Sequence, residues 1–303
     1  MTQWTVDNII YIMASKGYAR KVIQDKGIKV FSPYYGDNFP LRLFRELCFR
    51  LPFLPKTIWY NKAVLHQNVA FVNIIDVNIT EHYLRWIKKI YSDVQINFIY
   101  DNMVGRARNI SPDKIPSKIR IWTYDDYDSK KYGIRLFKKW ASPAINIKKQ
   151  NPEIDVFFIG RDKGRGEQLL ELEKKMNSLG LKTKFIITKD RKYSRTKSFY
   201  QNPISYEQVV EYDAKSRALL NITMPNQEGV TMRDIEATVI GIKLITTNKN
   251  IINKDLYHKK NVFILGKNQL SDLPSFLKED YVNVWETIKE NHTIDAMLDE
   301  ITC

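Results

Sequence analysis

The chain of 303 residues is long enough for two domains of about 150 residues each, and its 44% hydrophobic and 12% aromatic content excludes a disordered protein. Lysine and arginine outnumber the acidic residues by 48 to 34, and the resulting charge of +14 favours an anionic partner: nucleic acid, an anionic membrane surface or a phosphate-bearing ligand. The two cysteines and four histidines form no zinc-binding spacing, and no apolar run has the form of a signal peptide or a bilayer span, so we expect a cytoplasmic chain without a bound metal.

Short β-branched or apolar runs alternate with amphipathic segments in the first half of the chain. The runs predict four strands, at 28–32, 69–76, 95–100 and 119–123. Helical periodicity predicts two helices, at 80–91 and 128–140. Thr80 stands at the start of the first of these helices, where a hydroxyl can cap the free backbone amides.

The same alternation continues in the second half. Its apolar runs predict strands at 155–159, 184–188, 218–222, 243–247 and 261–265. Helices are predicted at 166–179, 206–217, 233–240 and 270–277, and over the last stretch, 282–301. Ser205 with Gln208 has the spacing of a capping box, and Gly180 follows the helix at 166–179 in the position that favours glycine.

Strands separated by helices indicate parallel sheets that are covered by helices on both faces. The polar, proline-containing segment 142–153 is the predicted linker, and it divides the chain into domains 1–145 and 146–303. The predicted fold class is therefore α/β, with two Rossmann-like doubly wound domains facing a cleft and a last helix able to pack back on the first domain. A ligand is expected outside the carboxyl ends of the strands.

A basic glycine-containing loop joins the strand at 155–159 to the helix at 166–179. It carries Arg161, Lys163 and Arg165, and its glycines allow the backbone to approach a ligand closely. Three cations beside a helix amino terminus suit a diphosphate. A solvated charged turn is the alternative that the loop by itself leaves open.

A second polar loop follows the strand at 218–222 and leads into the helix at 233–240. Glu228 and Glu236 are eight residues apart, so both can face one site, and a carboxylate can accept two hydrogen bonds from a ribose diol. The amides of Gly229, Val230 and Thr231 lie at the helix amino terminus and suit the distal phosphate. Glu236 could instead be an ordinary surface residue of the helix.

These segments carry a resemblance. The strand followed by GRDKGR, then QEGVTMRDIEA, then GIKLITTN resembles the carboxyl-terminal domain of GT-B glycosyltransferases, most closely a group that acts in bacterial lipopolysaccharide and capsular polysaccharide synthesis. The resemblance implies ribose binding by Glu236 and a role near the donor sugar for Glu228. The family's glycine–aromatic–glycine is replaced here by Gly229-Val230-Thr231, so Gln227 is expected to share the role of Glu228. The diphosphate is assigned to Arg161, Lys163 and Arg165.

The segment SKIRIWTYDDYDSKKYGIRLFKKW resembles the same group. Asp125 and Asp126 follow the strand at 119–123, and we predict an acceptor-side or hinge role for Asp125. If transfer inverts the sugar configuration, Asp125 or Asp126 is the candidate base. The triplet Asp126-Tyr127-Asp128 also fits the DxD motif that binds manganese in GT-A enzymes. Helix capping by one aspartate is the structural alternative.

The segment from Leu41 to Lys62 interleaves five cations with large apolar side chains. This composition suits a helix in the interface of an anionic membrane. Stacking with nucleic-acid bases and an ordinary amphipathic helix packed on the core are the alternatives.

The predicted function is a metal-independent glycosyltransferase of the hexosyltransferase type. Its donor would be a nucleotide sugar, expected to be UDP-linked, and its acceptor a hydroxyl of a glycan or a lipid-linked molecule in surface polysaccharide synthesis. The expected location is the cytoplasm or the inner face of the cytoplasmic membrane, and a homo-oligomer is compatible with the sequence. No nucleic-acid-binding motif is present, but a basic nucleic-acid-binding protein and an inactive GT-B partner subunit stay as alternatives.

Overall fold

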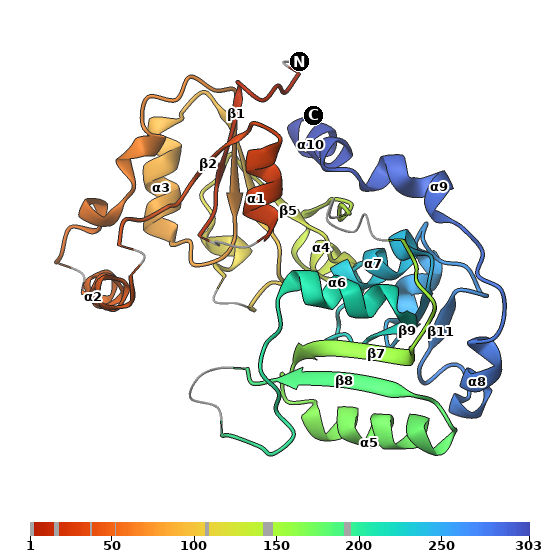
Figure 1. Ribbon diagram of the computed structural model, residues 1–303. Coiled ribbons are helices and arrows are strands. Elements are labelled where there is room, and N and C mark those ends of the chain that lie inside the picture. Colours follow the sequence, from red (N-terminus) through yellow and green to blue (C-terminus); the bar gives the residue numbers. More distant parts are fainter. Residues whose placement is uncertain are drawn as a thin grey trace. The chain divides into compact units, whose positions relative to one another are not determined.

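The computed structural model describes residues 3–14, 18–36, 38–51, 53–106, 109–141, 148–190 and 195–303. The chain forms two compact units, the first made of Met1–Lys138 with Ile294–Cys303 and the second of Lys139–Thr293 (Figure 1). Residues 142–147 of the predicted linker lie outside the described residues, so the predicted division at 145 stays a prediction.

The first unit is built on a six-stranded parallel sheet in the order β2-β1-β3-β4-β5-β6. Its strands are β1 (Ile9–Ile12), β2 (Lys29–Phe31), β3 (Phe71–Ile75), β4 (Gln95–Tyr100), β5 (Ile119–Thr123) and β6 (Arg135–Leu136). Its helices are α1 (Tyr18–Asp25), α2 (Phe39–Arg50), α3 (Glu81–Ile90), α4 (Asp126–Tyr132) and α10 (Ile294–Thr302), with 3-10 turns at Lys56–Trp59, Lys62–Val64 and Pro112–Lys114.

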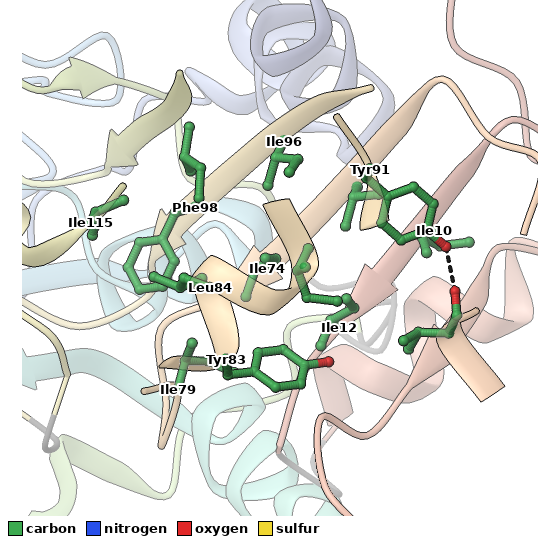
Figure 2. Packing of buried hydrophobic residues seen from close by; sticks show 14 of the residues in the cluster. Ile10, Ile12, Ile74, Ile79, Tyr83, Leu84, Tyr91, Ile96, Phe98 and Ile115 are labelled. Atoms are coloured by element: carbon green, nitrogen blue, oxygen red, sulfur yellow. Dashed lines mark hydrogen bonds between the residues drawn. The ribbon is translucent and has the colours of Figure 1, made fainter. Parts of the chain in front are cut away.

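The core of the first unit forms where the sheet meets α3. Figure 2 shows Ile12, Ile74 and Phe98 of the strands gathered around Leu84 and Tyr83 of the helix, all fully buried. Apolar residues recur in α3 at the helical period, so one face of the helix is buried and the opposite face carries its charges. The carboxyl-terminal helix α10 also belongs to this unit, where the Gln95 side chain donates a hydrogen bond to the carbonyl of Ile301 (2.9 Å).

Two predictions for the first unit were wrong, and two of its elements were not predicted. The strand β1 and the helix α1 were not predicted, because a four-residue strand with every residue buried shows no alternation. The helix predicted at 128–140 is α4, and it ends at Tyr132 because Gly133 takes the left-handed conformation (φ 62°). The basic-apolar segment is not one helix, since α2 ends at Arg50 and a 3-10 turn follows Pro55.

The second unit is built on a five-stranded parallel sheet in the order β11-β10-β9-β7-β8. Its strands are β7 (Ile154–Arg161), β8 (Thr183–Thr188), β9 (Ser216–Asn221), β10 (Lys243–Thr246) and β11 (Val262–Ile264). Its helices are α5 (Gly166–Ser178), α6 (Tyr206–Ala214), α7 (Met232–Ile240), α8 (Leu273–Phe276) and α9 (Trp285–Ile288), with 3-10 turns at Lys249–Asn253, Leu270–Asp272 and Lys289–His292.

Both faces of this sheet are buried. Successive residues of a strand point to opposite faces, so β7 contributes Phe157 to one core and Val156 and Phe158 to the other. The helices α6 and α7 cover the Phe157 face, and α5 and α8 cover the opposite face. This double burial explains why the strands read as continuous apolar runs, and it confirms the predicted α/β class with two Rossmann-like parallel sheets.

The end of the second unit also differs from prediction. The helix predicted over 282–301 is α9, a 3-10 turn and then α10, because the backbone is extended at Thr293 between them. Buried His292 holds this corner, with Nδ1 2.7 Å from the carbonyl oxygen of Lys139 and Nε2 3.1 Å from the carboxylate of Asp255. Among the helices of the described residues, none has the length and apolarity required to cross a bilayer.

Candidate functional site

A cavity of about 550 Å³ opens at the carboxyl ends of β7, β9 and β10 in the second unit. Three loops make its wall, one after each of these strands. The lining residues are Lys163, Gly164, Arg165, Gln168, Ile222, Thr223, Met224, Pro225, Asn226, Gln227, Glu228, Thr247, Asn248, Lys249 and Asn250. The position at the carboxyl edge of a parallel sheet is the one that the sequence predicted for a ligand.

The first loop begins with a tight turn. The amide of Arg165 donates to the carbonyl of Asp162 (2.9 Å), and the two central residues, Lys163 (φ 49°) and Gly164 (φ 80°), are both left-handed. Positive φ at both centres is the geometry of a type I′ turn, which glycine adopts without strain. The Lys163 amide donates to the side chain of Asp190 (2.8 Å), so the backbone is held while the lysine side chain stays exposed at the cavity.

Buried Asp162 fixes the start of α5. One of its oxygens accepts the amide of Gly166 (2.5 Å) and the other accepts the hydroxyl of Tyr200 (2.5 Å). The bond to Asp162 raises the pKa of the Tyr200 hydroxyl to about 12, so Tyr200 stays a donor at neutral pH. Glycine fits at 166 without displacing its neighbours, because a Cβ there would lie 2.7 Å from the ring of Phe199 and 2.9 Å from the carboxylate of Asp162. The helix therefore starts at a fixed point beside the cavity.

The guanidinium of Arg165 joins the first loop to the second. It donates to the carbonyl oxygen of Ile222 at the end of β9, and it lies 5.4 Å from the centre of the Phe158 ring. Burial lowers the pKa of Arg165, but an arginine keeps its charge at neutral pH because its ordinary pKa exceeds about 12. Arg165 thus brings a fixed positive charge to the cavity.

The second loop closes on itself through Gln227. Its amide donates to the carbonyl of Met224 (3.0 Å), and its side-chain oxygen accepts the amide of Met224 (3.1 Å). Pro225 and left-handed Asn226 (φ 65°) occupy the two central positions, which is the pattern of a type II turn. The loop therefore presents Gln227 and Glu228 from a defined backbone.

The third loop, after β10, supports the second. Asn248 is 2% exposed, and its amide group donates to the carbonyls of Glu228 (3.2 Å) and Gly229 (3.4 Å). Asn250 donates to the same carbonyl of Glu228 (3.3 Å). No ligand-binding role was predicted for this loop, although the run NKN directly after the predicted strand 243–247 indicates polar groups at the same edge of the sheet. It also adds Lys249 to the cavity wall. The wall therefore carries the cations Lys163, Arg165 and Lys249 and the carboxylate of Glu228.

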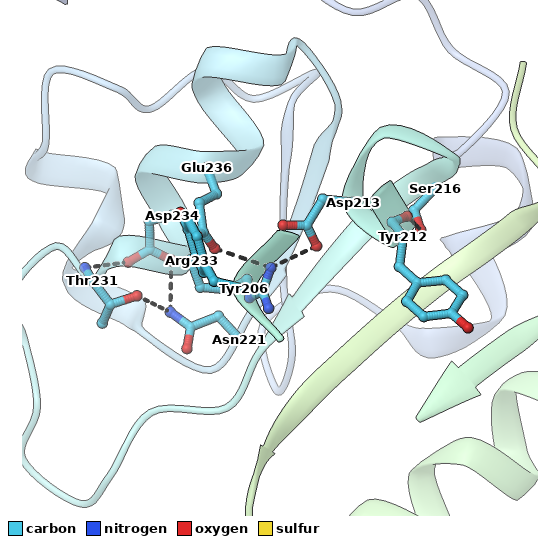
Figure 3. Close-up of polar contacts among 9 residues, drawn as sticks. All are labelled: Tyr206, Tyr212, Asp213, Ser216, Asn221, Thr231, Arg233, Asp234 and Glu236. Atoms are coloured by element: carbon cyan, nitrogen blue, oxygen red, sulfur yellow. Dashed lines mark hydrogen bonds and ion pairs between the residues drawn. The ribbon is translucent and has the colours of Figure 1, made fainter. Parts of the chain in front are cut away.

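Glu236 lies in α7 and is 4% exposed. One of its oxygens accepts the hydroxyl of Tyr206 (2.9 Å), and the other pairs with Arg233 (3.0 Å), as Figure 3 shows. The same nitrogen of Arg233 pairs with the fully buried Asp213 of α6 (2.6 Å). Burial raises the pKa of the Asp213 carboxyl to about 7. Glu236 is thus the end of a buried ionic network rather than a solvated helix residue.

The amino terminus of α7 is capped from within the chain. The amide of Thr231 donates to the side chain of Asp234 (2.8 Å), and the Asn221 side chain donates to both residues (Figure 3). Burial raises the pKa of Asp234 to about 6. The Thr231 amide, which the sequence assigned to a phosphate, is therefore engaged by Asp234 in this structure.

The structure separates the predicted site residues into three groups. Lys163, Arg165, Gln227 and Glu228 line the cavity. Five predicted residues do not line it. Arg161 is exposed at the end of β7, and Gly229 and Val230 are buried. Thr231 is the N-cap of α7, and Glu236 lies within that helix. The remaining two, Asp125 and Asp126, belong to the first unit.

Asp125 caps α4, as the structural alternative suggested. It is fully buried, and its side chain accepts the amide of Asp128 (3.2 Å). Asp128 is also buried and accepts the amide of Val104 (2.7 Å), whereas Asp126 is half-buried. Within the described residues, no group of three or more histidine, cysteine, aspartate or glutamate side chains could hold a metal ion. The acceptor-side roles of Asp125 and Asp126 stay predictions.

Comparisons with known proteins define the fold. No family model and no curated protein matches the chain. Among solved structures, it is similar to sucrose-phosphate synthase from Thermosynechococcus elongatus, with a TM-score of 0.58 and 10% identity over 97% of each chain. It is also similar to AviGT4, a glycosyltransferase involved in avilamycin A biosynthesis, with a TM-score of 0.50 and 14% identity over 76% of this chain and 81% of that one. At these identities the similarity shows the fold, and the chain has a GT-B-like fold.

Proposed function

We propose that the chain is a glycosyltransferase that takes its sugar from a nucleotide-sugar donor bound in the cavity of the second unit. The observation that carries the proposal is the cavity wall, where Lys163, Arg165 and Lys249 surround a space at the carboxyl ends of the strands of a GT-B-like unit. A volume of about 550 Å³ lies within the usual range of small-molecule sites, roughly 300–1,000 Å³.

The three cations suit the diphosphate of the donor. Arg165 is held in place by the carbonyl of Ile222, so its charge is positioned before the ligand arrives. Lys163 extends from a turn whose backbone is held by Asp190. Preorganised cations stabilise the negative charge that develops on the leaving diphosphate. Arg161, exposed at the end of β7, is proposed as a further phosphate contact. This chemistry needs orientation and charge rather than a metal ion.

The carboxylates are proposed to hold the two sugars of the donor. Glu228 and Gln227, on the cavity wall, would contact the transferred sugar, while Glu236 would accept hydrogen bonds from the ribose. The amides of Gly229 and Val230 stay candidates for the distal phosphate. The proposed donor is a UDP-linked hexose. The proposed acceptor belongs to surface polysaccharide synthesis.

The first experiment measures nucleotide binding. A thermal-shift screen of UDP, GDP, CMP and their sugars should reveal one stabilising nucleotide, because a ligand at 100 times its Kd adds about 2.7 kcal/mol to stability. Lys163→Gln should then weaken that nucleotide about tenfold, since it removes one charge-assisted bond. Lys174→Gln, at an exposed lysine of α5 that does not line the cavity, is the matched control and should bind like the wild type.

Two results would count against the donor site. If no nucleotide stabilises the wild type, the proposal fails, and steeply salt-dependent oligonucleotide binding would favour the nucleic-acid alternative. If Lys163→Gln and Lys174→Gln bind equally, the cavity is not the diphosphate site. Release of free sugar or a glycosylated acceptor from the bound donor separates an active enzyme from an inactive partner subunit.

We also propose that the first unit meets its acceptor at an anionic membrane surface. Leu43 and Phe44 of α2 lie four and three residues before Leu47, so the three side chains share one side of the helix, and each is more than half exposed. Arg45 and Cys48, on the other face, are buried, and Arg45 donates to the carbonyl of Tyr35 (2.7 Å). The helix therefore packs through one face and presents large apolar groups on the other.

The neighbouring residues extend this exposed surface. Phe53 is 75% exposed and Ile58 is 59% exposed, and Trp59 packs edge-on against Phe44 with 5.8 Å between ring centres. Between Leu41 and Lys62, one acidic residue accompanies five cations. Arg45 is buried, which leaves Arg42, Arg50, Lys56 and Lys62 for an anionic surface. Apolar side chains among cations suit a bilayer interface, where each lysine or arginine adds about 1 kcal/mol near anionic lipid.

Vesicle co-sedimentation tests this surface. The protein should bind weakly to neutral phosphatidylcholine vesicles and strongly to vesicles with added phosphatidylglycerol. Added salt should reduce the binding to the anionic vesicles. The double variant Leu43→Gln/Leu47→Gln should lose most of the binding, whereas Ile252→Gln, an exposed isoleucine of the second unit, should not. Equal binding by both variants would refute the assignment to α2.

A further inference from the structure

Lys249 is a cation of the cavity wall whose charge the chain does not use for its own contacts. It is exposed at the start of the 3-10 turn Lys249–Asn253, which follows β10, and it lines the cavity. Within the described residues, its side chain forms no ion pair and no hydrogen bond. Its ammonium group therefore faces the cavity with its charge available to a ligand.

The neighbours of Lys249 hold it beside Glu228. The side chains before and after it, Asn248 and Asn250, both donate to the carbonyl oxygen of Glu228, over 3.2 and 3.3 Å. Asn248 is buried, and its side-chain oxygen accepts the amide of Asn250 (3.0 Å). The backbone that carries Lys249 is therefore fixed against the loop that presents Glu228.

The other two cations of the wall come from the opposite side of that loop. In the sheet, β9 lies between β7 and β10. Lys163 and Arg165 follow β7, whereas Lys249 follows β10. Because neighbouring strands are about 4.8 Å apart, the two loops leave strand ends that are separated by about 10 Å. The loop of Glu228 lies between them, so Lys249 flanks the proposed sugar contact on the side away from β7.

The cations of the wall exceed what the diphosphate requires. Each phosphate of a nucleotide sugar carries one negative charge, and Lys163 and Arg165 match these two charges. Lys249 can then serve a further anionic group on the sugar. A uronic acid has such a group, because a carboxylate replaces its C6 hydroxymethyl. Glu228 would repel that carboxylate unless a cation stood beside it, since like charges at close range disfavour each other.

Resting on the donor site proposed above, we infer that Lys249 is a specificity-determining residue and that the transferred hexose is oxidised at C6 to a uronic acid. The ammonium group of Lys249 binds the C6 carboxylate and offsets its repulsion by Glu228. Gln227 and Glu228 keep their proposed contacts with the sugar hydroxyls. A neutral hexose has no group for Lys249 to bind.

Donor pairs that differ only at C6 test this inference. Titration calorimetry compares UDP-glucuronate with UDP-glucose, UDP-galacturonate with UDP-galactose, and GDP-mannuronate with GDP-mannose. In at least one pair, the wild type should bind the acidic donor about tenfold more tightly, the effect of one hydrogen bond between charged groups. Lys249→Gln should abolish or reverse that preference, while affinity for the neutral donor stays within about twofold of the wild type. Lys249→Arg keeps the charge and should retain part of the preference.

Lys267→Gln is the matched control. Lys267 is an exposed lysine in the loop after β11, at the same edge of the sheet, and it does not line the cavity. This variant removes the same charge from the chain and should keep the wild-type preference. The control thus separates a contact made by Lys249 from an effect of net charge.

Two results would overturn the inference and leave the donor site standing. The first is a wild type that binds these donors but prefers the acidic member of no pair. The second is an equal loss of affinity for the acidic and the neutral donor in Lys249→Gln, which would make Lys249 a further contact of the diphosphate. A wild type that binds none of the six donors, and neither UDP nor GDP, counts against the proposed function itself.

Discussion

Asn248 is the residue on which the shape of the candidate site depends most directly. Its buried side chain donates to the carbonyls of Glu228 and Gly229, so two bonds join the loops after β9 and β10. It also accepts the amide of Asn250 (3.0 Å), which is a bond within the loop after β10. Each such bond contributes about 0.5–1.5 kcal/mol net. Because Asn250 still reaches the carbonyl of Glu228 in a variant, we expect Asn248→Ala to cost about 2 kcal/mol.

This loss has a measurable size in a thermal scan. For a domain as large as the second unit, which spans Lys139–Thr293, 1 kcal/mol lowers Tm by about 2–4 °C. Asn248→Ala should therefore lower the Tm of that unit by about 4–8 °C in scanning calorimetry. It should also weaken nucleotide binding, because the backbone that carries Glu228 loses part of its support.

Asn253→Ala is the matched control. Asn253 lies in the same 3-10 turn, is exposed, and makes a single bond to the side chain of Asn250 (2.8 Å). Exposed substitutions of this kind change stability by less than about 0.5 kcal/mol. If Asn248→Ala and Asn253→Ala have the same Tm, the two loops are not held together in the way that the contacts of Asn248 suggest.

Burial raises the pKa of Asp213 to about 7, against about 3.9 in an unfolded chain. Between these values the folded state keeps a proton that the unfolded state has lost. The Tm should therefore fall as the pH rises from about 5 to about 7. Burial also raises the pKa of Asp234, to about 6, so Asp213→Asn should reduce this slope without removing it, and an unchanged slope would show that Asp213 does not contribute. Gly166→Ala places a Cβ 2.7 Å from the Phe199 ring and should lower Tm through a cost of about 1–3 kcal/mol; a Tm equal to that of the wild type would mean that the ring moves freely. Arg165→Lys keeps the charge but loses the planar contact with Phe158, so Tm should fall while nucleotide affinity changes less than about threefold; the reverse pattern in calorimetry would contradict the assignment.

Much of the fold was predictable because a buried parallel strand leaves a local signal. The strands β4 and β5 were predicted with their bounds, since each is a short run rich in β-branched and aromatic residues. The capping box of Ser205 and Gln208 was predicted as well, because its bonds join residues three apart. Signals that act within a few residues can be read without knowing the rest of the chain.

The failures fall where distant residues decide the conformation. The helix α4 stops at Gly133, and the next residues pair with β5 as β6, which a helical periodicity over 128–140 could not indicate. Likewise, α9 and α10 are separated at Thr293 and belong to different units. Tertiary packing outweighed the local helical preference at Thr293. At α4, the glycine that ends the helix is a local signal that the helical periodicity over 128–140 hid.

By itself, the sequence determined the α/β class, the alternation of strands and helices, and the residue types of the loops at one edge of each sheet, because these follow from local periodicity and turn chemistry. It also singled out Lys163, Arg165, Gln227 and Glu228, which do lie together on one cavity wall. Only the tertiary structure decided what surrounds each candidate. It brought the loop after β10 to the same cavity and joined Glu236 to a cation and a second helix, since both results depend on strand order and on contacts between residues far apart in the chain.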